Sequence, residues 1–139
     1  MKEFVLDTSA LFAFTDGEEG SDVVADLLRQ ACEERIGLLV SFASWMEMYY
    51  IYLQEQGKDE AEHWLAILKG LPLKRVESSE ELGMVAGELK AKHRLSFADA
   101  WIAAWSKKRE ATLVHKDPEF ESIAAEVTLM TLPYKSGGP

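Results

Sequence analysis

Short apolar runs alternate along the chain with longer segments of helical periodicity. The apolar runs predict strands at about residues 3–6, 37–40, 73–76, 112–115 and 127–132. Between them, apolar residues recur every three or four positions, which predicts helices at about residues 9–14, 21–35, 42–56, 58–69, 79–93 and 97–110. Such alternation is typical of an α/β domain in which helices cover both faces of a parallel sheet. We therefore expect a central, mostly parallel sheet of about five strands.

Serine and glycine residues indicate where several of these helices begin and end. Ser41 and Ser96 stand just before apolar helical segments, as N-caps do. Ser78 or Ser79, with acidic residues following, predicts the start of another helix. Gly57 separates two helical segments, and we expect one helix to end there and the next to begin.

Size and composition predict one globular domain. The chain has 139 residues, 47% of them hydrophobic and 28% charged, which excludes a disordered protein. We assign residues 1–134 to the domain and residues 135–139 to a flexible C-terminal tail. The single cysteine cannot form an internal disulfide, and the longest apolar stretch, residues 38–53, is interrupted by polar side chains. We therefore expect a soluble, cytoplasmic protein with no membrane partner.

The net charge of −9 argues against nucleic-acid binding by simple attraction, because phosphate contacts need lysine and arginine. An enzyme that binds nucleic acid through metal ions escapes this objection. Lys107, Lys108, Arg109 and Lys116 are candidates for local contacts to a phosphate backbone. Each of them alone is also explained as a solvated charge.

Four acidic residues stand at unusual positions. Asp7 follows the first predicted strand and Asp117 follows the fourth, where ligands bind in open α/β sheets. Glu47 and Asp99 interrupt helical segments that are apolar on almost every side. A buried ionised carboxylate is very costly unless it is paired or bound to a metal. Most other acids lie in polar runs and need no such explanation.

Each of the four acids also has a structural explanation. Asp7 suits a helix N-cap, Glu47 an ion pair, Asp99 a charge near a helix start, and Asp117 a turn before a proline. Together they favour another interpretation, because no basic residue stands near them in the apolar segments. Four converging carboxylates need a divalent cation, and oxygen ligands select Mg²⁺, Mn²⁺ or Ca²⁺ rather than zinc.

The segments around these acids resemble the four acidic motifs of PIN domains, specifically the VapC-like toxins of bacterial and archaeal toxin–antitoxin pairs. The motifs read VLDTSALFAF, the Glu in SFASWMEMYYIY, LSFADAWIAAW and TLVHKDPEF. The resemblance extends from about residue 3 to residue 132. Its first and third motifs are the most specific.

The resemblance implies a three-layer α/β/α fold and a Mg²⁺- or Mn²⁺-dependent endoribonuclease, the toxin component of a type II toxin–antitoxin system. Asp7, Glu47, Asp99 and Asp117 would be the catalytic residues and metal ligands, directly or through water. The implied partners are an RNA substrate, a second copy of the chain in a homodimer, and an antitoxin whose C-terminal segment covers the active site.

Four further residues have a possible supporting role, three by the same resemblance and His115 as a departure from it. Thr8 and Ser9 would orient the first acid or bind phosphate, although both also suit a helix start. Glu119 resembles the acid that follows the last catalytic one in the family. His115 stands where many relatives have Thr or Ser. It either simply ends the fourth strand, or it contacts the RNA phosphate or alters the pH response of the site.

Two rival functions differ in what the sequence would need. A phosphatase of the haloacid-dehalogenase type wants a second Asp two residues after the first, where this chain has Ser9. A catalytically idle PIN-like module that binds RNA or protein needs the same acids as a nuclease, so the sequence leaves it open.

The aromatic residues between 42 and 68 exceed what one inner face needs, and some of them are candidates to line a groove for a partner helix. These are Trp45, Tyr49, Tyr50, Tyr52 and Trp64.

Overall fold

Five parallel strands form the central sheet of the computed structural model, which describes residues 1–135. The elements in chain order are β1 (Lys2–Leu6), α1 (Thr8–Thr15), α2 (Ser21–Cys32), β2 (Ile36–Ser41), α3 (Phe42–Gln56), α4 (Lys58–Lys69), β3 (Lys74–Val76), α5 (Glu80–Lys92), α6 (Phe97–Arg109), β4 (Thr112–His115), the 3₁₀ helix η1 (Pro118–Ile123) and β5 (Leu129–Thr131). The strand order is β3-β2-β1-β4-β5, and all neighbours are parallel. The predicted parallel α/β sheet is confirmed. Of the expected tail, residues 136–139 lie outside the described residues.

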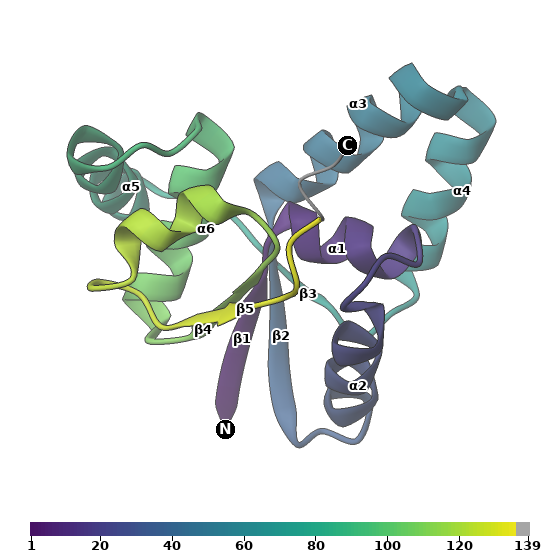
Figure 1. Cartoon of the computed structure of the whole chain (residues 1–139), viewed down its shortest axis with the longest axis horizontal. Helices are drawn as coiled ribbons and strands as arrows, with labels where there is room; N and C mark the ends of the chain where they lie inside the picture. The colour runs from purple at the N-terminus through teal and green to yellow at the C-terminus, as the bar shows by residue number, and fades with distance from the viewer. Residues whose placement is uncertain (136–139) are drawn as a thin grey trace.

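Alternate residues of the central strand separate two hydrophobic cores. Phe4 and Leu6 of β1 point to one face, where they pack with apolar residues of α1, α2, α3 and α4. Val5 points to the other face and packs with residues of α5, α6 and η1. Successive side chains of a strand alternate between faces, so one strand supplies both cores. The result is three layers, with α1 to α4 on one side of the sheet and α5 and α6 on the other (Figure 1).

Several predicted helix starts are confirmed by hydrogen bonds. Ser41 Oγ accepts from the Ala43 amide at 3.2 Å, and Ser96 Oγ accepts from the Asp99 amide at 3.1 Å. Of the two serines proposed for α5, Ser79 is the cap. Its Oγ accepts from the Leu82 amide at 3.1 Å.

Two elements are clearly shorter than predicted, and one was not predicted. Helix α2 ends at Cys32, not near residue 35, and Glu34 beyond it has a left-handed φ of 61°. Strand β5 is shorter than residues 127–132. The 3₁₀ helix η1 was not predicted, because Asp117 and Pro118 suggested only a turn. Among the described helices, none is long and apolar enough to cross a bilayer.

Candidate metal centre

The strand order brings the four predicted acids to one edge of the sheet. Strands β1 and β4 are parallel neighbours, and the Asp7 amide donates to the Val114 carbonyl at 3.0 Å. Asp7 and Asp117 therefore lie just beyond the carboxyl ends of adjacent strands. Glu47 comes from α3, which starts directly after β2 on the other side of β1, and Asp99 lies in the first turn of α6.

The pKa values of two of these acids show that the charges act on one another. Burial is the largest cause that raises the pKa of Asp99 to about 8, and the charges of Asp7, Asp117 and Glu47 raise it further. Burial also raises the pKa of Asp7 to about 6, against the lowering effect of its hydrogen bonds from Ser9. Within residues 1–135, no Lys, Arg or His forms an ion pair with any of the four carboxylates. In the described part of the chain, the carboxylates of the cluster therefore converge without an ion-paired basic side chain.

Three carboxylates lie close enough to share one cation. Asp99, Asp117 and Glu119 each place a carboxylate oxygen within 4.8 Å of the other two. Glu119, which the sequence suggested only as a supporting residue, belongs to this group. Asp7 and Glu47 lie outside it, although their charges reach Asp99.

One carboxylate oxygen of Asp7 gives the most direct indication that this site suits a cation. Asp7 is 2% exposed, and its Oδ1 has no hydrogen-bond partner among the described residues. An unpaired, buried carboxylate oxygen is strongly destabilising. A hard divalent cation such as Mg²⁺ or Mn²⁺ prefers carboxylate ligands. The donor set of this site fits such an ion.

The hydroxyl of Ser9 holds Asp7 in its orientation. Both the amide and the Oγ of Ser9 donate to Asp7 Oδ2, the amide at 2.9 Å. Ser9 Oγ in turn accepts from the Lys116 amide at 2.8 Å. The Ser9 hydroxyl thus both donates and accepts a hydrogen bond. Of the two Asp7 oxygens, Oδ1 is the one without a hydrogen-bond partner among the described residues. Of the roles left open by the sequence, orienting Asp7 is the one this geometry supports.

The hydroxyl of Thr8 plays the same part for Glu47. It lies 2.6 Å from Glu47 Oε1 and 2.9 Å from Ser44 Oγ. Because a carboxylate can only accept, the Thr8 hydroxyl donates to Glu47. Sequence reasoning missed Ser44, which is fully buried. Its signal was available, since Ser44 interrupts the same apolar segment as Glu47 and stands three residues before it on the same helix face.

His115 is fully buried, and its ring nitrogens bind protein groups. Nδ1 accepts from the Asp117 amide at 3.2 Å, and Nε2 lies 2.9 Å from Thr131 Oγ1. Burial lowers the pKa of this imidazole. A ring without exposed surface does not reach a phosphate, so the geometry supports a structural role at the end of β4.

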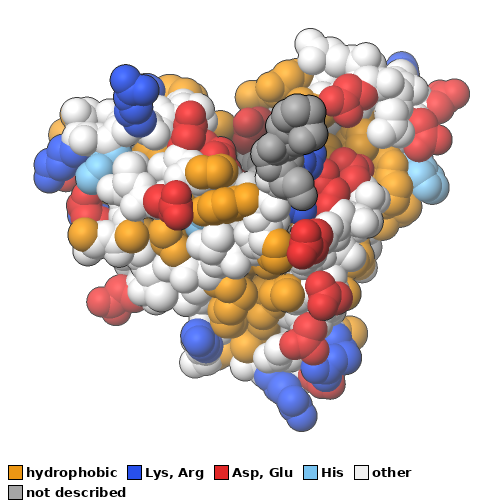
Figure 2. Space-filling model, viewed as in Figure 1, with side chains coloured by type: hydrophobic (Ala, Val, Ile, Leu, Met, Phe, Trp, Pro, Cys, Tyr) orange, Lys and Arg blue, Asp and Glu red, His pale blue; other side chains and the backbone are white. Residues whose placement is uncertain are grey.

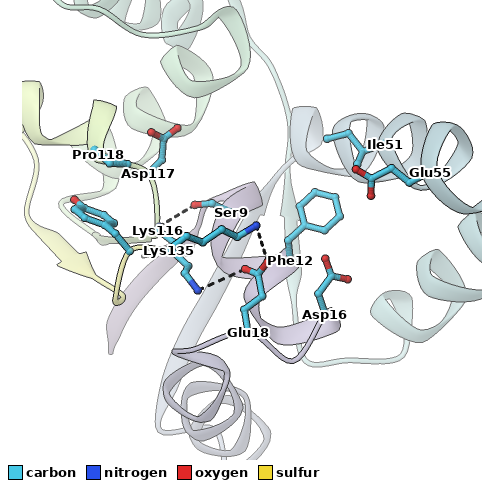
Figure 3. Close-up of a pocket in the computed structure, with 11 residues that line it drawn as sticks. Ser9, Phe12, Asp16, Glu18, Ile51, Glu55, Lys116, Asp117, Pro118 and Lys135 are labelled. Carbon is cyan, nitrogen blue, oxygen red and sulfur yellow. Dashed lines mark hydrogen bonds and ion pairs between the residues drawn. The ribbon is translucent and has the colours of Figure 1, made fainter. Parts of the chain in front are cut away.

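A cleft of about 530 Å³ opens beside the cluster (Figure 3). Polar, apolar, acidic and basic residues all line this cleft: Ser9, Phe12, Asp16, Glu18, Ile51, Glu55, Lys116, Asp117, Pro118, Tyr134 and Lys135. The molecule is hollowed between the lobe of α5 and α6 and the lobe of α3 and α4, with acidic side chains at the margins (Figure 2).

The basic residues suggested as phosphate contacts are engaged elsewhere. Lys116 is buried, and its Nζ donates to the Glu19 carbonyl at 2.7 Å and lies 3.6 Å from Glu18 (Figure 3). The other three pair with surface acids: Lys107 with Glu126, Lys108 with Glu81, and Arg109 with Glu3. All four of these residues therefore already have partners within the described part of the chain.

A three-layer α/β/α domain with carboxylates gathered at the carboxyl edge of a parallel sheet defines the class of this protein. The model of the PIN domain family matches residues 4–126. The chain therefore belongs to the PIN domain family.

Solved structures with the same fold include toxin–antitoxin complexes. VapBC2 from Rickettsia felis, bound to a DNA fragment from its promoter, is 19% identical with a TM-score of 0.76, over 94% of this chain and 99% of that one. DNA-bound VapBC from Salmonella typhimurium is 20% identical with a TM-score of 0.72, over 94% and 98%. VapC20 from Mycobacterium tuberculosis, a toxin that cleaves the sarcin–ricin loop, is 19% identical with a TM-score of 0.68, over 90% and 96%. At these identities the likeness shows the fold. The comparison with curated proteins found no match.

Proposed function

We propose that this chain is a Mg²⁺- or Mn²⁺-dependent endoribonuclease and the toxin component of a type II toxin–antitoxin system. The observation that carries the proposal is the buried Oδ1 of Asp7, which has no hydrogen-bond partner among residues 1–135, beside carboxylates whose charges raise one another's pKa values. Membership of the PIN domain family and the shared fold of VapBC complexes and of a toxin that cleaves the sarcin–ricin loop support it.

Asp7, Glu47, Asp99 and Asp117 hold the cation in this proposal, directly or through water, and Glu119 adds a fifth carboxylate. A bound divalent cation supplies Lewis-acid chemistry, since it lowers the pKa of water and stabilises negative charge on phosphate oxygens. The cation would also offset the repulsion between RNA phosphates and a protein of net charge −9, because it makes an acidic pocket attractive to phosphate. The side chains contribute orientation: the hydroxyls of Ser9 and Thr8 direct the carboxylates, and the cleft beside Asp117 leaves room for a substrate strand.

The proposed partners are an antitoxin and a second copy of the chain, and the proposed location is the cytoplasm. Of the aromatic residues considered for a partner groove, Tyr52 is fully buried and Tyr50 is 42% exposed. The other three are partly buried and pack against the core. Met46 and Leu53 are also exposed, at 61% and 36%. With Tyr50 they are spaced four and three residues apart, so they form one outer apolar stripe on α3. A protein partner that covers this stripe would remove it from water.

The test is RNA cleavage by purified protein freed of any inhibitor. We expect a structured RNA to be cut with Mg²⁺ or Mn²⁺ and to stay intact with EDTA. The variant Asp7→Asn/Asp99→Asn should be folded and inactive. Cleavage that persists in EDTA, or in this variant, would overturn the proposal. Mg²⁺-dependent stabilisation without cleavage of any RNA would favour the idle binding module instead.

A further inference from the structure

Two of the three carboxylates that lie within reach of one another follow β4 closely: Asp117 in the loop that leads to η1, and Glu119 in the first turn of η1. We propose that His115 is the positioning residue of this loop: its imidazole fixes the Asp117 backbone against β5 and so sets the geometry of both carboxylates. This inference rests on the proposed function, because it assigns His115 a role in the same cation site. The ring touches neither cation nor substrate in this role.

The hydrogen bonds of His115 define one tautomer. Nδ1 accepts from the Asp117 amide at 3.2 Å, so it carries no proton. The proton is therefore on Nε2, which donates to Thr131 Oγ1 at 2.9 Å. His115 and Thr131 are also register partners in the β4–β5 ladder, and the Leu132 amide donates to the His115 carbonyl at 2.8 Å. The imidazole thus bridges the loop to a strand that is itself held in register.

The position of Asp117 passes directly to Glu119. Asp117 Oδ1 accepts from the Glu119 amide at 3.0 Å and so caps η1. The buried Phe120 ring of η1 lies 5.3 Å from the His115 ring, centroid to centroid, so η1 also packs against the imidazole. A change in the Asp117 backbone therefore moves both carboxylates relative to Asp99. Asp7 is held by Ser9, whose Oγ accepts from the Lys116 amide one residue before Asp117, so the same loop also reaches Asp7.

Two substitutions separate the two ring nitrogens. His115→Asn keeps an acceptor near the position of Nδ1 and loses the donor to Thr131. His115→Gln keeps a donor near Nε2 and loses the acceptor for the Asp117 amide. Val127→Ala is the control, since Val127 is buried in the core behind β5 and takes no part in the loop. Each variant is measured for Mn²⁺ affinity by titration calorimetry and for melting temperature in EDTA.

We expect His115→Gln to bind Mn²⁺ about tenfold or more weakly than the wild type, as is typical when a group that orients metal ligands is lost. His115→Asn should stay within about threefold of the wild type, and Val127→Ala should melt lower with unchanged affinity. Equal loss of affinity in the Asn and Gln variants, or wild-type affinity in the Gln variant, would overturn the proposed role of His115 and leave the proposed function standing. A wild-type protein that binds no Mn²⁺ would overturn the proposed function, and this inference with it.

Discussion

Neutralising Asp99 should stabilise the metal-free protein. Burial and the charges of three neighbouring carboxylates raise the pKa of Asp99 from 3.8 to about 8. Each pKa unit corresponds to about 1.4 kcal/mol, so a rise of roughly four units disfavours folding by about 5 kcal/mol at pH 8. Asp99→Asn keeps the shape of the side chain and removes the charge. Because the site relaxes and water enters it, we expect a net gain of about 1–3 kcal/mol, which raises the melting temperature by roughly 3–10 °C.

The assay is thermal unfolding of the wild type and of Asp99→Asn at pH 8, in EDTA and in Mg²⁺. At a Mg²⁺ concentration about a hundred times its Kd, the wild type should gain about 2.7 kcal/mol, and the variant much less. Asp22 offers a matched control, since it is an exposed acid in the first turn of α2. Asp22→Asn should lose only a few tenths of a kcal/mol, from the helix dipole, and keep the wild-type response to Mg²⁺.

The opposite pattern would refute this reasoning. If Asp99 only stabilised the start of α6, Asp99→Asn would melt below the wild type in EDTA and respond to Mg²⁺ as the wild type does. That result would remove Asp99 from the metal centre and weaken the case for a nuclease.

Three further predictions concern pH, a supporting hydroxyl and a surface. In EDTA, the free energy of unfolding should fall as the pH rises from about 5 to about 8, because Asp7 and Asp99 have higher pKa values in the folded protein than in the unfolded chain. The stability present at low pH is lost as the pH rises through about 6 for Asp7 and through about 8 for Asp99. A free energy of unfolding that stays constant or rises with pH over this range would contradict this prediction. Ser9→Ala should weaken Mn²⁺ binding about tenfold in calorimetry, because Asp7 loses an orienting hydrogen bond, whereas unchanged affinity would leave Ser9 only a helix-start residue. The variant Met46→Lys/Tyr50→Lys should sediment as a monomer, whereas the wild type should sediment as a dimer. A variant that still sediments as a dimer would place the dimer interface away from the apolar stripe on α3.

Local sequence patterns were sufficient for most of the secondary structure and for the first choice of site residues. Periodicity predicted α4 at the bounds it has, and Ser41 and Ser96 cap the helices that they were expected to begin. These features depend on residues within one turn of each other, so they can be derived from spacing alone. Asp99 was recognisable because a charged residue in an apolar helix needs an unusual environment.

The tertiary structure alone decided which groups meet. The order β3-β2-β1-β4-β5 places Asp7 beside Asp117, and no local pattern specifies that order. The inclusion of Glu119 in the carboxylate group depends on η1, a short 3₁₀ helix that Asp117 itself caps. The environment of Lys116, which the sequence left open, depends on contacts with a segment distant along the chain, and the unpredicted η1 depends on the turn geometry of the loop. Burial and side-chain direction arise from such packing, and they determine whether a lysine or a histidine near the site faces a ligand or the core.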